Sequence, residues 1–111
     1  MKTVTLAKKR RYLKKELLRI KRALIRLGAK KIILFGSFAR GQVGRTTDID
    51  LLVVKDTNAT FSERLTEIYN NIVPRTATDI LVYTQSELDV LSKWNIFIRK
   101  ILKEGKIIYA A

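Results

Sequence analysis

The stretch from residue 32 to residue 54, IILFGSFARGQVGRTTDIDLLVV, holds two apolar runs separated by a turn of small and basic residues. The first run, residues 32–35, predicts a short buried strand, and Gly36 permits the sharp exit that the end of such a strand needs. The second run, residues 49–54, predicts another buried strand. The stretch thus predicts two short strands on either side of a glycine-containing turn.

Two aspartates stand at the start of the second run. Side chains alternate along a strand, so Asp48 and Asp50 should point to the same face, about 7 Å apart. Asp48 could also act as a turn former, but Asp50 lies inside an apolar strand, where an unpaired carboxylate is costly. Carboxylates this close repel one another unless a cation sits between them. The pattern indicates one or two Mg²⁺ ions that hold a nucleoside triphosphate.

The spacing Gly36-Ser37, ten residues, Asp48-Ile49-Asp50 resembles the signature of the DNA polymerase β-like nucleotidyltransferase superfamily. The resemblance is closest to its smallest members, the minimal nucleotidyltransferases (MNT) encoded beside HEPN-domain proteins. It extends over roughly residues 30–109 and the motif is matched without a gap. The resemblance implies a polymerase β-like α/β (α+β) fold and an enzyme that transfers nucleotides.

A third acid, Asp79, precedes the apolar residues 80–82 on what should be the neighbouring strand. It could be a surface residue at the beginning of that strand. The resemblance instead implies a catalytic and metal-binding set of three, in which Asp48 and Asp50 bind both metals and Asp79 helps to activate the attacking hydroxyl. The expected metal is Mg²⁺, as two ions, with Mn²⁺ as the alternative.

The turn itself supplies candidates for binding the nucleotide. A glycine at a strand end lets backbone N–H groups approach phosphate oxygens, and a short hydroxyl can donate without bulk, so Gly36 and Ser37 are expected to contact the triphosphate. Arg40 could neutralise its charge, and Arg45 is a weaker candidate for the same role. Among the aromatic residues, Phe38 and Trp94 are the candidates for stacking on a base, whereas Phe35, Tyr69, Phe97 and Tyr109 are expected in the core.

Composition limits the possible chemistry. The 111 residues contain no cysteine and no histidine, which excludes disulfides, thiolate sites and histidine acid–base catalysis. A metal must therefore be held by oxygen ligands. No apolar run is long enough to span a membrane and no signal-peptide pattern is present, so a cytoplasmic protein is expected.

The positive charge is concentrated at the beginning of the chain. Residues 1–31 contain thirteen Lys/Arg and one acid, a formal charge of +12. Residues 32–111 are nearly neutral, at +1. Residues 13–27 repeat leucine and isoleucine at helical spacing, which predicts a basic amphipathic helix within residues 1–28 that ends at Gly28. Such a surface indicates an anionic partner or only a solvated face, and a nucleic acid is possible but not favoured.

The remaining pattern predicts one domain over residues 1–111, with a catalytic core at 30–109. Two capping boxes, Thr60-x-x-Glu63 and Thr84-x-x-Glu87, open helices. The predicted order is a helix, two strands, a helix, a strand, two helices and a strand, with a small mixed sheet that carries its helices on one face. Predicted strands are 30–35, 48–54, 78–83 and 106–109; predicted helices are 60–72, 84–91 and 94–104, with one helical turn near 38–40.

The resemblance implies a specific reaction: transfer of AMP from ATP to a hydroxyl, expected to be a tyrosine of a HEPN ribonuclease toxin, so that the chain is the antitoxin. An alternative is a binding module with little or no activity, which neutralises a toxin or binds nucleic acid through its basic helix. A domain of this size has little surface with which to enclose a nucleotide. An oligomer, with itself or with the toxin, is therefore plausible.

Overall fold

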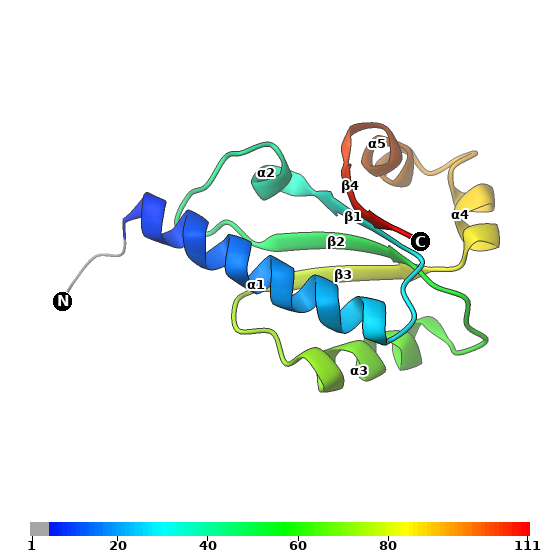
Figure 1. Ribbon diagram of the computed structural model, residues 1–111. Helices are drawn as coiled ribbons and strands as arrows, with labels where there is room; N and C mark the ends of the chain where they lie inside the picture. Colours follow the sequence, from blue (N-terminus) through cyan, green and yellow to red (C-terminus); the bar gives the residue numbers. More distant parts are fainter. Residues whose placement is uncertain (1–4) are drawn as a thin grey trace.

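A computed structural model describes residues 5–111, which form a four-stranded sheet and five helices (Figure 1). The strands lie in the order β3-β2-β1-β4. Within the described residues, no helix combines the length and the apolar character needed to cross a membrane. The elements are α1 (Leu6–Arg26), β1 (Lys31–Phe35), α2 (Gly36–Ala39), β2 (Ile49–Val54), α3 (Phe61–Ile72), β3 (Thr78–Tyr83), α4 (Gln85–Leu91), α5 (Ile96–Glu104) and β4 (Lys106–Ala110).

The sheet is mixed, as the sequence predicts. Strand β1 pairs antiparallel with both β2 and β4, whereas β2 pairs parallel with β3. Parallel neighbours need a crossover connection, and α3 supplies it. The parallel register matters for function because it pairs Ile49 with Thr78 and Asp50 with Asp79 at the beginning of both strands.

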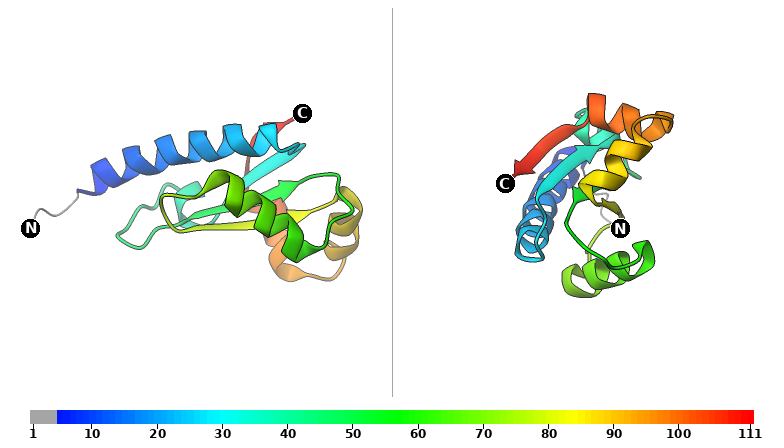
Figure 2. Two further views of the ribbon diagram at one scale, coloured as in Figure 1. Left: turned by 90° about the horizontal axis from the view of Figure 1, so that it is seen from below. Right: turned by 90° about the vertical axis from the view of Figure 1, so that its right-hand side faces the viewer.

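Helices cover both faces of the sheet, and the prediction of a single helical face is wrong. Leu51 and Val53 pack with α1 and α3, whereas Leu52 and Val54 pack with Leu88 of α4 and with α5. Figure 2 shows the two helical layers on either side of the strands. The physical reason is the uninterrupted apolar run of β2, because a strand that is apolar on both faces must be covered on both. We call these the α1 face and the α5 face.

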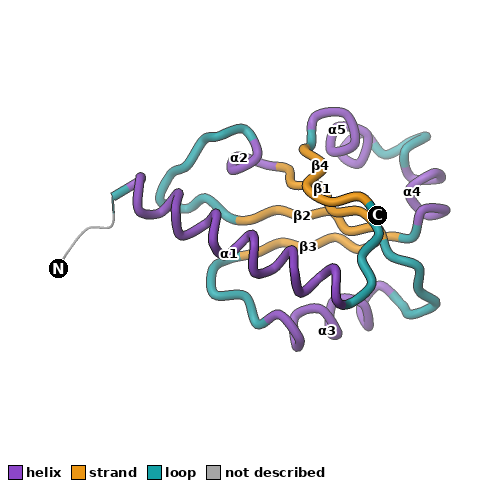
Figure 3. Tube along the Cα trace, viewed as in Figure 1, coloured by secondary structure: helices purple, strands orange, loops and turns teal. Residues whose placement is uncertain are grey.

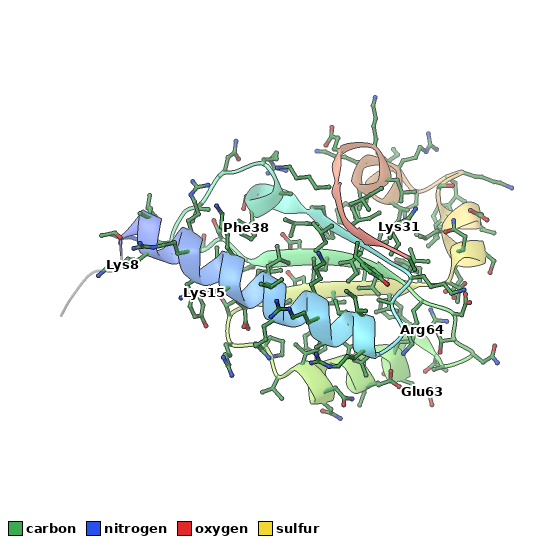
Figure 4. All side chains as sticks on the ribbon, in the orientation of Figure 1. Lys8, Lys15, Lys31, Phe38, Glu63 and Arg64 are labelled. Atoms are coloured by element: carbon green, nitrogen blue, oxygen red, sulfur yellow. The ribbon has the colours of Figure 1, made fainter. Side chains whose placement is uncertain are left out.

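Helix α1 packs as its spacing predicts. Leu13, Ile20 and Leu24 are almost fully buried against the α1 face. Lys8 and Lys15 project from the helix and are exposed (Figure 4). Most of the basic helix therefore covers the side of the sheet that lies opposite α5.

One acid interrupts the buried stripe of α1. Glu16 is 4% exposed and accepts hydrogen bonds from Arg19, at 2.7 and 2.9 Å, and from the backbone N–H of Arg75, at 2.6 Å. Arg19 also donates to the carbonyl oxygens of Ile72 and Val73 at the end of α3. These bonds satisfy a buried carboxylate and join α1 to the loop before β3.

The first half of α1 contacts two loops at the same end of the sheet (Figure 3). The side chains of Lys9 and Arg10 donate to carbonyl oxygens of Arg45 and Gly41, in the loop between α2 and β2. The hydroxyl of Tyr12 donates to the carbonyl oxygen of Arg75. This end of the helix therefore positions the loops on either side of the strand ends that carry the aspartates.

The predicted boundaries agree closely with the structure. Both capping boxes are present, with Thr60 and Thr84 as the N-cap residues. The last helix begins at Ile96 and not at Trp94, because the Asn95 side chain accepts from the N–H of Ile98 and sets a later start. The predicted helical turn after β1 is α2, which begins two residues earlier than expected.

The Glu16 contacts predict a defined loss of stability. Glu16→Gln should lower the free energy of unfolding by about 2 kcal/mol at neutral pH, because it removes hydrogen bonds to a charged group at a buried position. The Arg19 hydrogen bond lowers the pKa of Glu16 below its ordinary 4.5. The stabilisation is therefore complete above about pH 4.5 and lost as the pH falls through the lowered value.

Urea unfolding at a series of pH values measures this effect. The curves of the parent and Glu16→Gln should converge in acid. Lys15→Gln, an exposed neighbour on the same helix, should differ from the parent by less than about 0.5 kcal/mol. Equal losses in the two variants at neutral pH would contradict the assignment.

Candidate active site

The parallel register places Asp50 and Asp79 on adjacent strands at the same level. Successive side chains of β2 point to opposite faces, and Asp50 lies two residues before Leu52, so it shares the α5 face with Leu52. Asp79 shares that face and is exposed, whereas Asp50 is half-buried. Asp48 lies just before β2 and is also half-buried.

The pKa of the Asp50 carboxyl is raised above its ordinary value. Burial is the largest cause, followed by the negative charges of Asp79 and Asp48 and by a hydrogen bond shared with Asp79, and together they raise the pKa of Asp50 from 3.8 to about 6. All of these causes disfavour the ionised form. A cation between the carboxylates would reverse the effect of the two neighbouring charges.

Gly36 is required beside Asp50 for two reasons. A Cβ at this position would lie 2.2 Å from Oδ2 of Asp50 and 3.1 Å from its Cγ. The residue also has φ +78°, which L side chains rarely adopt. The pairing of Phe35 with Asp50 across β1 and β2 explains the close approach, because it brings the end of β1 directly against the aspartate. The glycine of the motif therefore makes room for the carboxylate.

The hydroxyl of Tyr69 hydrogen-bonds to the backbone of β3 on both sides of Asp79. It donates to the carbonyl oxygen of Thr78, at 2.7 Å, and accepts from the N–H of Ile80, at 3.2 Å. These two backbone groups flank Asp79 on β3, which is an edge strand. The sequence indicates only an aromatic core residue here, because nothing local shows that its hydroxyl reaches the edge of a distant strand.

A pocket of about 240 Å³ adjoins Asp50 on the α5 face. Three predicted site residues line it, namely Gly36, Arg40 and Asp50. The opposite wall comes from α5 and was missed by the sequence analysis, because only the tertiary structure brings this helix to the motif. The residues that complete the lining are Phe35, Ala39, Phe97, Lys100, Ile101, Glu104 and Gly105.

The other predicted site residues lie outside the lining of this pocket. Asp79 contacts Asp50, and the negative charge of Asp48 raises the pKa of Asp50. Ser37 is half-buried in α2, and within residues 5–111 its side chain makes no hydrogen bond. Arg45 is exposed in the following loop.

The predicted stacking residues need correction. Phe38 is 8% exposed and belongs to the core on the α1 face, so it is not available to a base (Figure 4). Trp94 is exposed but does not line the pocket. Phe97, which was expected in the core, is 55% exposed at the pocket. The helical period allows Phe97 to face either way, and the helix turns Ile98 and Ile101 inward instead.

The donor chemistry of the aspartates suits Mg²⁺, which prefers carboxylate oxygen. As they stand, however, no three His, Cys, Asp or Glu side chains in residues 5–111 form a group that could hold a metal ion. Asp50 and Asp79 are in contact, whereas Asp48 acts on Asp50 only through its negative charge. The expected set of three carboxylates is thus present as a contacting pair with a third acid nearby.

The raised pKa of Asp50 predicts how metal-free stability depends on pH. In the folded state Asp50 keeps a proton that it releases at pKa 3.8 in the unfolded state. The contribution of this protonated carboxyl to the free energy of unfolding is therefore complete below pH 3.8 and is lost as the pH rises through about 6. In EDTA, Asp50→Asn should therefore become more stable relative to the parent as the pH rises from about 4 to about 6. After allowance for solvent screening, the gain should be about 1 kcal/mol.

Chemical unfolding at several pH values measures this gain. Asp89→Asn, which changes an exposed acid of α4, should show no such trend relative to the parent. A difference between Asp50→Asn and the parent that stays constant over this range would contradict the electrostatic description of the site.

Comparisons with known proteins agree with this geometry. The family model described as "Polymerase beta, Nucleotidyltransferase" matches residues 18–111, which include the whole motif and α5. The "Putative protein adenylyltransferase" of Methanocaldococcus jannaschii is 34% identical over 83 residues, which cover 72% of this chain and 78% of that protein. These matches confirm the family and the fold that the motif predicts. The chain belongs to the polymerase beta nucleotidyltransferase family and is a nucleotidyltransferase.

Proposed function

We propose that the chain transfers AMP from ATP, with Mg²⁺, to a tyrosine hydroxyl of a HEPN ribonuclease toxin, and that this modification makes it the antitoxin of the pair. The observation that carries the proposal is the contact between Asp50 and Asp79 beside Gly36. Two carboxylates in contact at the ends of rigid strands, next to a glycine turn, suit the transfer of a nucleotide. The relative named as an adenylyltransferase supports AMP as the group transferred and a protein as the acceptor.

The proposed reaction is an in-line displacement at the α-phosphorus of ATP. A new bond forms between the acceptor oxygen and this phosphorus, and the bond to the β-phosphate oxygen breaks, so that pyrophosphate leaves. Asp79 is the exposed member of the pair and is proposed to accept the proton of the attacking hydroxyl. Tyr69 positions Asp79 by holding the backbone on both sides of it.

Asp48, Asp50 and Asp79 are the residues proposed to hold Mg²⁺. Bound there, the cation would stabilise the charge that develops on the phosphates. The raised pKa of Asp50 supports this assignment, because burial and the negative charges of Asp79 and Asp48 all disfavour its ionised form, which a bound cation would favour. Asp48 would have to approach the pair to complete the ligand set.

The turn after β1 is proposed to bind the triphosphate. Gly36 borders the pocket and lies against Asp50, so a phosphate held near the carboxylates would pass close to its backbone. Arg40 lines the same pocket and carries a compensating charge. The hydroxyl of Ser37, which has no partner within the described residues, is proposed to donate to a phosphate oxygen.

The size of the pocket supports a partner protein. Ligand pockets usually measure roughly 300–1,000 Å³, and the volume of about 240 Å³ beside Asp50 can enclose only part of a nucleotide. The acceptor protein is proposed to complete the site. The first half of α1 lies at the same end of the sheet as the aspartates (Figure 1), so a partner that docks on its basic residues and extends around the α2–β2 loop is proposed to reach them.

Incubation of the purified chain with a HEPN toxin, Mg²⁺ and labelled ATP tests the proposal. The toxin should gain label and the mass of one AMP unit on a tyrosine, measured by intact mass and peptide mapping. Asp79→Asn should slow the transfer by roughly 100-fold or more, the usual loss when a general base is removed. Asp89→Asn should transfer at the parent rate, since it lies on the exposed side of α4.

Ribonuclease activity of the toxin provides the second measurement. The modified toxin should lose activity, because an added nucleotide brings bulk and negative charge to an RNA-binding centre. If the triple variant at Asp48, Asp50 and Asp79 neutralised the toxin as well as the parent does, the enzymatic account would fail. Simple binding would then be the mechanism.

A further inference from the structure

We propose that α5 forms one wall of the donor site, in which Phe97 stacks on the nucleobase and Lys100 binds the phosphates. The inference rests on the proposed function, since it assumes a nucleoside triphosphate beside Asp50. It assigns roles to a helix outside the Gly-Ser and Asp-x-Asp motif.

The spacing of the α5 residues is the first argument. Phe97, Lys100, Ile101 and Glu104 lie at positions i, i+3, i+4 and i+7 of one helix, so they share a face. All four line the pocket that also contains Asp50. An aromatic ring, a cation and a carboxylate on one helix face offer contacts for the base, phosphate and sugar parts of a nucleotide.

The helix is fixed close to the motif, which makes its side chains suitable for a binding wall. Ile98 and Ile101 are 1% and 3% exposed and pack against the α5 face of the sheet. The following residue, Gly105, has no room for a side chain, because a Cβ there would lie 2.4 Å from Cγ2 of Ile33. A helix held this tightly presents Phe97 and Lys100 in a constant position relative to Asp50.

Charge supports the role of Lys100. Two lysines within residues 5–111 form ion pairs, Lys30 with Asp56 and Lys55 with Glu67. Within residues 5–111, neither Lys100 nor Arg40 forms an ion pair, although both line a pocket that contains acids. Two cations at one pocket, one on α5 and one just after α2, are well placed to bind the several negative charges of a triphosphate.

The exposure of Phe97 supports the role of its ring. The ring lies 5.9 Å from that of Phe35 and is nearly perpendicular to it, at 82°. Because this is one edge contact, at least one face of Phe97 is left uncovered by Phe35, and the residue is 55% exposed. An uncovered aromatic face at the edge of a pocket is a stacking surface for a base.

Two substitutions, each with a matched control, test these roles through binding. Lys100→Ala is compared with Lys103→Ala, and Phe97→Ala is compared with Ile96→Ala. The control residues lie on the same helix, are exposed and do not line the pocket. Affinities for ATP and for AMP are measured with Mg²⁺ by calorimetry or by competition against labelled ATP, and thermal melting confirms that each variant is folded.

The two roles predict different patterns. Lys100→Ala should weaken ATP binding by roughly tenfold and AMP binding by much less, because AMP lacks the phosphates on which the cation acts. Lys100→Arg should largely restore the affinity for ATP. Phe97→Ala should weaken ATP and AMP by a similar factor, also roughly tenfold, because stacking acts on the base that both ligands share. Lys103→Ala and Ile96→Ala should bind as the parent does.

The outcomes separate this inference from the proposed function. If the parent binds ATP but the two test variants match their controls, the α5 wall is wrong and the proposed function stands. An equal loss of ATP and AMP affinity in Lys100→Ala would overturn the phosphate role. If the parent binds no ATP in the presence of Mg²⁺, the α5 wall is overturned, whereas the proposed function is decided separately by the transfer of label to the toxin.

Discussion

The contact between Asp50 and Asp79 is the constraint on which the rest of the site depends. Two like charges at the level of the same strand ends oppose folding, and the fold nevertheless holds them together. The parallel pairing of β2 with β3 sets their register. Gly36 leaves the space that Asp50 occupies, and Tyr69 fastens the strand segment that carries Asp79. Three separate features thus maintain an unfavourable arrangement, as is typical of sites built to hold a cation or to move a proton.

A second buried acid, Glu16, shows that the chain supplies hydrogen-bond donors to a buried carboxylate elsewhere in the fold. Glu16 is more deeply buried than Asp50, yet its pKa is lowered, because Arg19 and a backbone N–H bind it. Asp50 receives no such partner from the described residues, although Arg40 and Lys100 line the same pocket. The contrast indicates that the acidic site is not a general consequence of a charge-rich sequence. At this site, the partner that Asp50 lacks would come from a bound ligand.

Local signals in the sequence were sufficient for the elements and for the motif. The apolar runs, the Gly-Ser turn and the capping boxes gave boundaries within about two residues, because each depends on neighbours in the chain. The second helical face, the pocket wall of α5 and the support from Tyr69 depend on contacts between distant segments, so no local pattern contains them. The same reason explains the two phenylalanines: Phe38, expected to be available to a base, is buried, and Phe97, expected in the core, is exposed. Helix orientation decides which of the two rings is covered.

The melting temperature of the parent and of Asp50→Asn, with and without Mg²⁺ and ATP, tests the central claim most directly. Without ligands, Asp50→Asn should melt at the higher temperature at neutral pH, because it avoids the burial of an ionised carboxylate beside the charges of Asp79 and Asp48, which together raise the pKa of Asp50. With Mg²⁺ and ATP, the parent should gain stability and the variant should gain little, since binding to the folded state alone raises its stability. Equal shifts in both proteins, or no shift in the parent, would contradict the account.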